Sequence, residues 1–471
     1  MVSSGGSQTA DWPSTEGRLP AAQQERWLGS LVTSGILVIG VERVRTGRLA
    51  RTGLILFLLL AVVACSGAGT IIPTASPRPT APAPPNPIVP TSGAVTPTPI
   101  PTPIPTPSLT ASPAASPRPM APATLRPGPA MTTAREGQAA VRLDDGRVLI
   151  LGGSVPFTGK CGMACVDPAT ASVEIYNPST GKFSPNGSLA EPRADGKALL
   201  LNDGRVLVSG GNGQYGSLLS TIEIYDPAHR TSVVVKPSAD TPKLQVDPAV
   251  VLLADGRVLI AGGFSDNLYT PSNVTLIFDP ASGGFSNGPL MAEARQGATA
   301  TLLDDGRVLV VGEEQSAELI DPLHPLSQST FWVSRYPGTS ILLSDGRVLV
   351  AEWGQSNGAG CPTPTVSEVF DPRTETFNRV SPMRTPRTES AVINVQDGRV
   401  LFFGGIDSKC LAAGTVEAFD PDSGTFQVIA TGFPEITGFS ATLLDDGEIL
   451  IAGGGGAAWN EMTDASWILK P

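Results

Sequence analysis

The chain has 471 residues, with 52 glycines, 45 prolines and a formal net charge of -11 at pH 7. This length allows one large hydrophobic core or two smaller ones. An acidic surface repels phosphate, and no basic run interleaved with aromatic residues occurs, so the composition excludes a nucleic-acid partner.

Residues 41–65 are predicted to be an export signal that ends in a lipidated cysteine. Four arginines between positions 43 and 51 precede an apolar run, Leu54 to Ala64, that is too short to cross a bilayer. The run enters Cys65 through Val-Val-Ala, which resembles the bacterial lipobox, so we expect Cys65 to carry lipid. An uncleaved membrane anchor is the alternative. The expected location is the cell envelope or cell surface, with the protein exported and lipid-anchored to a membrane.

The chain that precedes this signal is longer than the polar start of a signal needs. Residues 1–40 form an N-terminal extension of uncertain status, and translation that begins near Val41 or Val44 would explain it.

Residues 66–121 are predicted to be a disordered linker. Pro, Thr, Ala and Ser dominate from Ile71 onward, and Pro occupies every second position from Pro97 to Pro107. Such a composition cannot pack a core and favours a semi-rigid polyproline spacer. A ligand for an aromatic groove is the alternative interpretation.

One phrase recurs seven times after the linker. It consists of an apolar strand, an Asp-Gly turn, a second apolar strand and a glycine doublet, as in Ala139–Gly153, Lys197–Gly211 and Ala249–Gly263. Asp-Gly supplies the positive φ that a tight hairpin needs. The later turn glycines are Gly306, Gly346, Gly398 and Gly447. The spacing of about 40 to 60 residues suits propeller blades and is too long for leucine-rich or ankyrin units.

Each unit continues with a third strand that ends in Asp-Pro or an equivalent, and often with a fourth strand that contains Phe. The stretch from Asp145 to Gly153, followed by Val173 to Pro178, resembles kelch repeats. The resemblance covers residues 122–471 and implies an all-β fold: a seven-bladed kelch-type β-propeller of four-stranded antiparallel blades, similar to the central domain of galactose oxidase. A six-bladed ring or two separate subdomains is the alternative.

The seventh unit ends after its third strand, Ser466 to Lys470, and Ala123 to Met131 resembles the missing fourth strand. In kelch-like rings the two chain ends meet in one blade, so we expect closure there.

The residue after the turn glycine is Arg in six units, whereas the seventh has Glu448. The residue before the third-strand Pro is Asp or Asn, whereas the seventh unit has Lys470. We therefore expect a cross-strand ion pair in each blade.

An arginine stands immediately before the first strand in five units: Arg135, Arg193, Arg295, Arg335 and Arg387. First strands line the channel of a propeller, so these arginines are predicted to form a basic collar at its mouth that binds an acidic peptide or glycan. The alternative is that each arginine bonds to backbone as part of the repeat.

The same loop face is predicted to carry the aromatic binding residues Tyr215, Tyr269, Trp353 and Trp459, with Phe157. Glu313, Glu314 and Glu352 lie near them in the sequence pattern and would neutralise the collar or complete a polar site.

Four cysteines follow the linker, in loops suited to disulfides in an exported protein. We expect the pairs Cys161 with Cys165 and Cys361 with Cys410, the second joining neighbouring blades. No histidine accompanies them, which argues against a metal cluster.

Catalytic motifs are absent from the sequence. Galactose oxidase needs histidines and tyrosines that converge on copper, but the two histidines here, His229 and His324, follow third-strand turns on the opposite face. Asp-box, nucleophile-elbow and phosphate-loop patterns do not occur.

We therefore predict a surface-anchored module that is not an enzyme, has no cofactor or bound metal, and binds a peptide, glycan or envelope partner at the loop face. The alternatives are a glycan-active enzyme with an Asp/Glu pair and a scaffold or assembly component.

Overall fold

The computed structural model describes residues 120–158, 167–239, 241–264, 270–312, 316–324, 329–333, 337–352, 366–456 and 461–471. The predicted extension, signal and nearly all of the linker lie outside these residues. Within the described part, no helix has the length and hydropathy needed to cross a membrane. The described residues include one short 3-10 turn, η1 (Gln214–Gly216).

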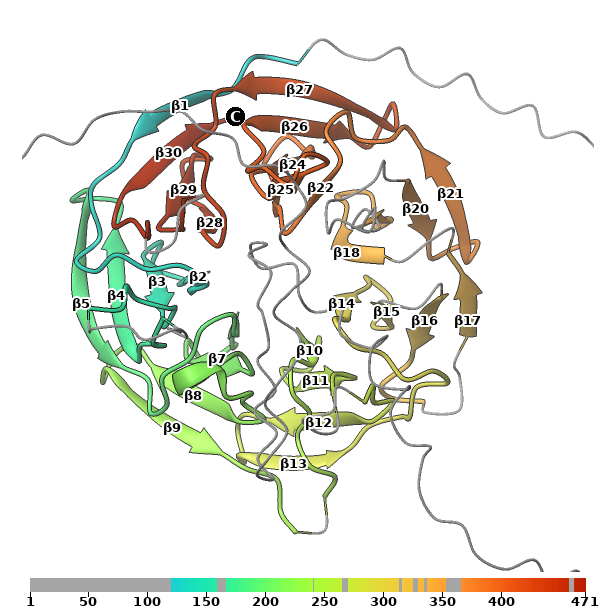
Figure 1. Cartoon of the computed structure of the whole chain (residues 1–471). Coiled ribbons are helices and arrows are strands. Elements are labelled where there is room, and N and C mark those ends of the chain that lie inside the picture. Colours follow the sequence, from blue (N-terminus) through green and yellow to red (C-terminus); the bar gives the residue numbers. More distant parts are fainter. Residues whose placement is uncertain are drawn as a thin grey trace, which may run out of the picture. The chain divides into compact units, whose positions relative to one another are not determined.

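Seven four-stranded antiparallel sheets surround a central axis, as Figure 1 shows. We number them as blades one to seven in chain order. The prediction of an all-β, seven-bladed propeller is confirmed, including blades four and five, where the glycine doublet is lost.

The first strand of each blade lies nearest the centre of the ring, and the second strand pairs with it on the outer side (Figure 1). The first strands are β2 (Ala139–Arg142), β6 (Lys197–Leu200), β10 (Ala249–Leu252), β14 (Thr299–Leu302), β18 (Pro337–Leu342), β23 (Ala391–Asn394) and β28 (Ser440–Leu443). The second strands are β3 (Val148–Leu151), β7 (Val206–Ser209), β11 (Val258–Ala261), β15 (Val308–Val311), β19 (Val348–Glu352), β24 (Val400–Phe403) and β29 (Ile449–Ala452).

The third and fourth strands complete each blade toward the rim. The third strands are β4 (Ser172–Asn177), β8 (Ile222–Asp226), β12 (Thr275–Asp279), β16 (Ser316–Ile320), β20 (Ser367–Asp371), β26 (Thr415–Asp420) and β30 (Ser466–Lys470). The fourth strands are β5 (Lys182–Ser188), β9 (Thr231–Val235), β13 (Gly284–Asn287), β17 (Ser329–Trp332), β21 (Thr376–Val380), β27 (Thr425–Thr431) and, for blade seven, β1 (Thr124–Pro127). A small extra pair, β22 (Arg387–Thr388) with β25 (Ile406–Asp407), lies in blade six.

The second strands are apolar apart from their last residue in β7 (Ser209) and β19 (Glu352), because both of their faces are buried. In β3, Val148 and Ile150 pack with residues of blade seven, whereas Leu149 and Leu151 pack with residues of blade two. Alternate side chains of a strand point to opposite faces, so a strand between two neighbours needs a continuous apolar run rather than an alternating one.

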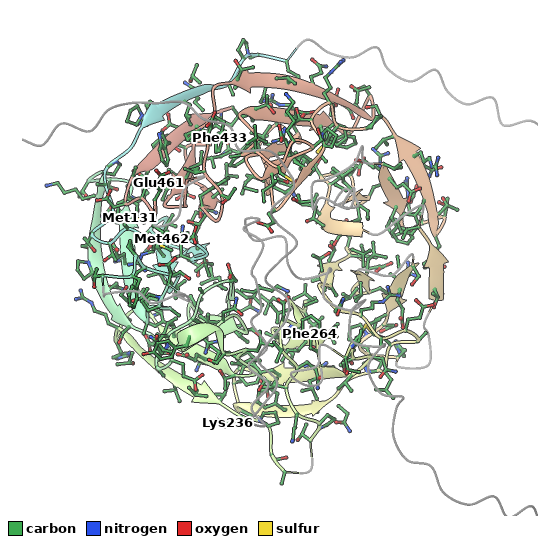
Figure 2. The ribbon with its side chains drawn as sticks, viewed as in Figure 1. Met131, Lys236, Phe264, Phe433, Glu461 and Met462 are labelled. Atoms are coloured by element: carbon green, nitrogen blue, oxygen red, sulfur yellow. The ribbon has the colours of Figure 1, made fainter. Side chains whose placement is uncertain are left out.

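Seven hydrophobic clusters result, each shared by two neighbouring blades. Figure 2 labels Phe433, which belongs to the cluster between blades six and seven. Since each cluster holds half of one blade and half of the next, a blade is stable only with both neighbours in place.

Blade seven closes the ring as the sequence predicts. Its strand order is β1-β30-β29-β28, and β1 pairs with β30 in the register Thr124 with Lys470 and Leu125 with Leu469. The N-terminal strand therefore supplies the outer edge of the last blade.

The predicted ion pairs beside the turns are wrong in their partners. Each arginine after a turn glycine bonds to the aspartate two residues before it, within the turn, as in Arg205 with Asp203 (2.6 Å). The hydrogen bond from Arg205 holds the pKa of Asp203 below its usual range. In blade seven Glu448 pairs with Arg126 of β1 at 2.6 Å.

The closure predicts an asymmetric effect of truncation at the C-terminus. Deletion of Ser466–Pro471 removes β30, which separates β1 from β29, and exposes the clusters on both sides of blade seven. We expect loss of the cooperative thermal transition, followed by circular dichroism. Deletion of Pro471 alone, which lies beyond β30, is the control and leaves the melting temperature unchanged. A variant without β30 that melts like the wild type would contradict this role of the joint.

Candidate functional site

The loops after the glycine doublets and those that enter the first strands lie together on one face, here called the loop face. Single bridges join Glu136 to Ser154 in blade one and Ala194 to Asn212 in blade two. The residues predicted to bind a ligand belong to these connections.

Arg135 of the predicted collar is directed into its own blade. Its Nη1 donates to the carbonyl oxygens of Gly152 (2.8 Å) and Ser172 (3.1 Å). Its Nη2 donates to Ser172 Oγ (3.0 Å) and Glu174 Oε1 (2.6 Å). The partners come from the doublet and the third strand, so the guanidinium spans the blade from within.

The same arrangement recurs in three other blades. The ion pairs are Arg193 with Glu223 (2.6 Å), Arg295 with Glu318 (3.7 Å) and Arg387 with Glu417 (2.9 Å). Each of these arginines also bonds to the main chain and the hydroxyl group of a Ser or Thr that begins or precedes the third strand.

Burial corrects the expected role of these arginines. The four described side chains are at most 1% exposed, and burial lowers the pKa of Arg135 and Arg387 against the opposing effect of their glutamates. A ligand at the surface does not reach a guanidinium group held in this way. They therefore form no basic collar in this structure, and the architectural alternative describes their geometry. Arg335 lies outside the described residues.

The sequence carries a signal for this pairing that we did not use. A glutamate stands three residues before the Asp or Asn that precedes the third-strand Pro in every blade that has the arginine, Glu368 of blade five included. Blade three has Gln245 and Leu276 at the two positions, and blade seven has Ile436 and Trp467. The arginine and the glutamate are thus either both present or both absent in a blade. This is expected for a buried ion pair, because a buried charge without its partner destabilises the fold.

The arginine backbone also joins neighbouring blades. The N–H of Gly153 in blade one donates to the carbonyl oxygen of Arg193 in blade two at 2.8 Å. Gly152 has φ +66°, and a Cβ built on it would lie 2.2 Å from the same oxygen. The doublet is therefore glycine because the next blade approaches its backbone closely.

A second repeated position lies two residues after the arginine, just before the first strand of the blade. We call these residues the mouth ring. Gly137 donates its N–H to Gly438 of blade seven (2.7 Å), and Asp195 of blade two donates to Gly137 (2.6 Å). The described members with positive φ are Gly137, Asp195, Asp247, Gly297, Glu389 and Gly438, with values between 50° and 63°.

Three mouth-ring positions thus carry an acid where the backbone favours glycine. Asp195 has φ +56°, Asp247 +50° and Glu389 +54°. Left-handed backbone costs an ordinary residue about 1–2 kcal/mol, although aspartate tolerates it better than glutamate does. Asp195 accepts a hydrogen bond from Asn212 (3.0 Å), and Asp247 lies 3.3 Å from Lys197 Nζ.

Of the predicted aromatic residues, Tyr215 lies in η1 after the doublet of blade two. It is 82% exposed and has φ +56°. Tyr269, Trp353 and Trp459 lie outside the described residues, as do Glu313 and Glu314. Phe157 of blade one is described and half-buried, and its N–H donates to Asp167 at 3.1 Å, so the aromatic part of the predicted site rests, in the described part, on Tyr215 and Phe157.

Cys410 is disulfide-bonded, with φ +62°. Cys161, Cys165 and Cys361 lie outside the described residues, as does Cys65. The two predicted pairings and the lipidation of Cys65 stay predictions.

The two histidines lie in third-strand turns of different blades. His229 Nδ1 is 2.7 Å from Asp226, and His324 Nδ1 is 2.9 Å from Asp321. Both side chains are more than 70% exposed. In the described part of the chain, no group of three His, Cys, Asp or Glu residues is arranged to hold a metal ion.

No family profile matches the chain, and no curated protein sequence matches it. Among solved structures, a fungal alcohol oxidase of the AA5 family in complex with copper is similar, with a TM-score of 0.54 and 16% sequence identity. The match covers 74% of this chain and 76% of that chain. With the seven blades, it confirms a galactose oxidase-like propeller of the kelch type.

The same match contradicts the prediction that the chain is not an enzyme, because the matched protein is an alcohol oxidase. At this identity the likeness establishes the fold and transfers no reaction. Copper in particular does not fit the described residues, since His229 and His324 are each paired with an aspartate in separate blades.

Substitutions in blade two test the buried pair against the combination found in blade three. Glu223→Leu leaves Arg193 buried without its carboxylate, and Arg193→Gln leaves Glu223 without its guanidinium, so each is expected to cost about 3–5 kcal/mol of unfolding free energy. The double variant recreates the Gln245 and Leu276 combination. We expect it to cost less than the sum by about 0.5–3 kcal/mol in urea titrations.

Glu191→Gln is the matched control, because Glu191 is the half-exposed second partner of Arg193 at 3.3 Å. Its expected cost is below about 1 kcal/mol. Strictly additive losses in the double variant would contradict a coupled pair.

Proposed function

We propose that the propeller is a recognition module whose partner, a peptide or a glycan, contacts the mouth ring on the loop face. The proposal is carried by one observation: Asp195, Asp247 and Glu389 occupy mouth-ring positions whose positive φ favours glycine. Strained backbone persists where the residue serves something other than stability, and loops on a rigid scaffold are the usual place for binding.

The charge of the mouth favours neutral or positively charged groups on the partner. The four described arginines of the predicted collar are buried and paired, whereas Asp195 and Glu389 are exposed. Lys197, two residues after Asp195, forms an ion pair with Asp247. Carboxylates accept hydrogen bonds from sugar hydroxyls and from lysine or arginine side chains. The exposed ring of Tyr215 adds an aromatic surface that suits a sugar or an apolar side chain.

Export and anchoring form the second part of the proposal. A lipid on Cys65, followed by the Pro-rich residues 66–121, would hold the propeller outside a membrane at the end of a spacer. A protein in this position meets peptides and glycans of the envelope rather than cytosolic ligands.

The charge preference is tested with the full chain on a glycan array and with two labelled peptides, one rich in lysine and one rich in aspartate. The triple variant Asp195→Asn, Asp247→Asn, Glu389→Gln removes three negative charges from the mouth. We expect the wild type to prefer neutral glycans or the lysine-rich peptide, and the variant to bind them about tenfold more weakly. Binding of the lysine-rich peptide should weaken with added salt.

The matched control removes three acids from the turns on the opposite face: Asp144→Asn, Asp304→Asn and Asp422→Asn. It changes the net charge equally and should leave binding unchanged, and thermal melts establish that both variants fold. Preference for the aspartate-rich peptide, or equal binding by the mouth variant, would refute the proposed site.

The anchor has its own test. A Cys65→Ala variant should incorporate no labelled fatty acid and should leave the membrane fraction. The matched control Cys410→Ala keeps Cys65 and should remain acylated. Unchanged labelling of the Cys65 variant would disprove the lipoprotein assignment without affecting the proposal for the loop face.

A further inference from the structure

The fourth strand of blade two, β9, lies at the outer edge of the ring and carries an exposed valine, Val233, at its centre. Its five residues, Thr231 to Val235, contain no proline and no charged residue, and its register with β8 is regular. It ends the sheet order β6-β7-β8-β9, so one side of its backbone has no strand partner in the described part of the molecule. An exposed edge of this kind is a template for pairing with another strand.

Four of the other fourth strands carry features that block such pairing, whereas β13 and β17 lack both proline and charge. Pro185 lies in β5 and Pro127 in β1. In β27 the register shifts at its pairing with β26, and the carbonyl oxygen of Ile429 accepts the N–H of Ala123. Arg379 places a charge in β21. Proline, bulges and charges are the usual protection of edge strands.

Val233 in the middle of β9 breaks a pattern kept by the other blades. The fourth-strand residue opposite the central apolar residue of the third strand is polar elsewhere: Ser184, Ser286, Ser329, Asn378, Gln427 and Arg126. In blade two it is Val233, opposite Ile224, and its side chain is 63% exposed. An apolar residue therefore faces solvent where the repeat places a polar one.

A recess of about 290 Å³ lies beside this valine, between blades two and three. Its apolar lining comes from Ile224, Val233, Val235 and Phe278. Arg205 and Asp226 supply charged groups to the lining. This volume is at the small end for a ligand pocket and suits one or two aliphatic side chains. A strand added to β9 would place alternate side chains on the face that carries Val233.

Two cations flank the strand. Arg230 and Lys236 are both exposed, and neither forms an ion pair within the described residues. Figure 2 labels Lys236 at the outer margin of the ring. An antiparallel pairing of β9 with a second copy, centred on Val233, would oppose Arg230 to the second copy's Lys236, and like charges directly opposite each other are destabilising. Because Arg230 and Lys236 lie at the two ends of β9, a partner strand with an acidic residue at each end is favoured.

We propose that β9 is a docking strand for an extended peptide that pairs antiparallel with it. The peptide's acidic ends lie opposite Arg230 and Lys236, and its central aliphatic side chain lies at the recess beside Val233. Main-chain hydrogen bonds give such a complex its affinity, and the recess and the two cations give it specificity. This surface lies at the rim of the ring and is independent of the loop face.

The test measures binding of the labelled peptide Asp-Thr-Val-Val-Val-Thr-Glu to the full chain by fluorescence anisotropy. We expect saturable micromolar binding that weakens with salt, and protection of the Thr231–Val235 amides from hydrogen exchange when the peptide is added. The peptide with Lys at both ends should not bind. Val233→Ser, which restores the polar pattern of the other blades, should weaken binding about tenfold. Lys236→Glu should weaken it by a similar factor.

Asn378→Ser changes the equivalent position of β21 and is the matched control, with unchanged binding expected. Val233 and Lys236 are exposed, so we expect each variant to fold, and thermal melts check this. The proposal is overturned if no saturable binding occurs up to about 1 mM peptide, or if Val233→Ser binds like the wild type. It is also overturned if light scattering finds a dimer that Val233→Ser dissociates, because β9 would then serve self-association.

Discussion

The whole ring depends on the burial of each second strand between two neighbouring blades. Val148 and Ile150 belong to one interblade cluster and Leu149 and Leu151 to the next, and the same division recurs around the axis. No blade owns a complete core. The ring must therefore close to be stable, and it does so because β1, from the N-terminal side of the propeller, completes the sheet of blade seven.

The buried Arg–Glu pairs add positional order to this packing. Glu174 accepts the backbone N–H of Thr132 at 2.7 Å while it holds Arg135, so one carboxylate ties the incoming loop to the third strand. A buried pair is weak evidence for net stability. Its contribution here is to fix where the chain enters the first strand, and hence the geometry of the mouth ring two residues later.

Much of the fold could be predicted from the sequence because its local signals repeat. Asp-Gly turns, apolar second strands and glycine doublets recur in the chain, and the missing fourth strand after Lys470 pointed to Ala123–Met131. The direction of Arg135 could not be read from its position alone, because a residue before the channel strand can face either the channel or the blade. The joint loss of arginine and glutamate in blades three and seven contained that information.

The acids of the mouth ring were harder to predict. Asp195 and Glu389 read as ordinary loop residues until their backbone conformation is known, since the ring is defined by φ and by contacts between blades. Val233 is a similar case. A valine in a strand is unremarkable in sequence, and only the strand register reveals that it occupies a position polar in the other blades.

The joint in blade seven also determines how the ring responds to mechanical force. The chain before Met120 enters the propeller through Ala123, whose N–H bonds to Ile429, and continues directly into β1 at the outer rim. Tension applied to the N-terminal side therefore loads Ala123, which belongs to the cluster between blades six and seven, and then the hydrogen bonds between β1 and β30. The resistance of the protein to such a load is set by the four residue pairs from Thr124 to Pro127 together with the packing of Ala123 and Leu125 in that cluster.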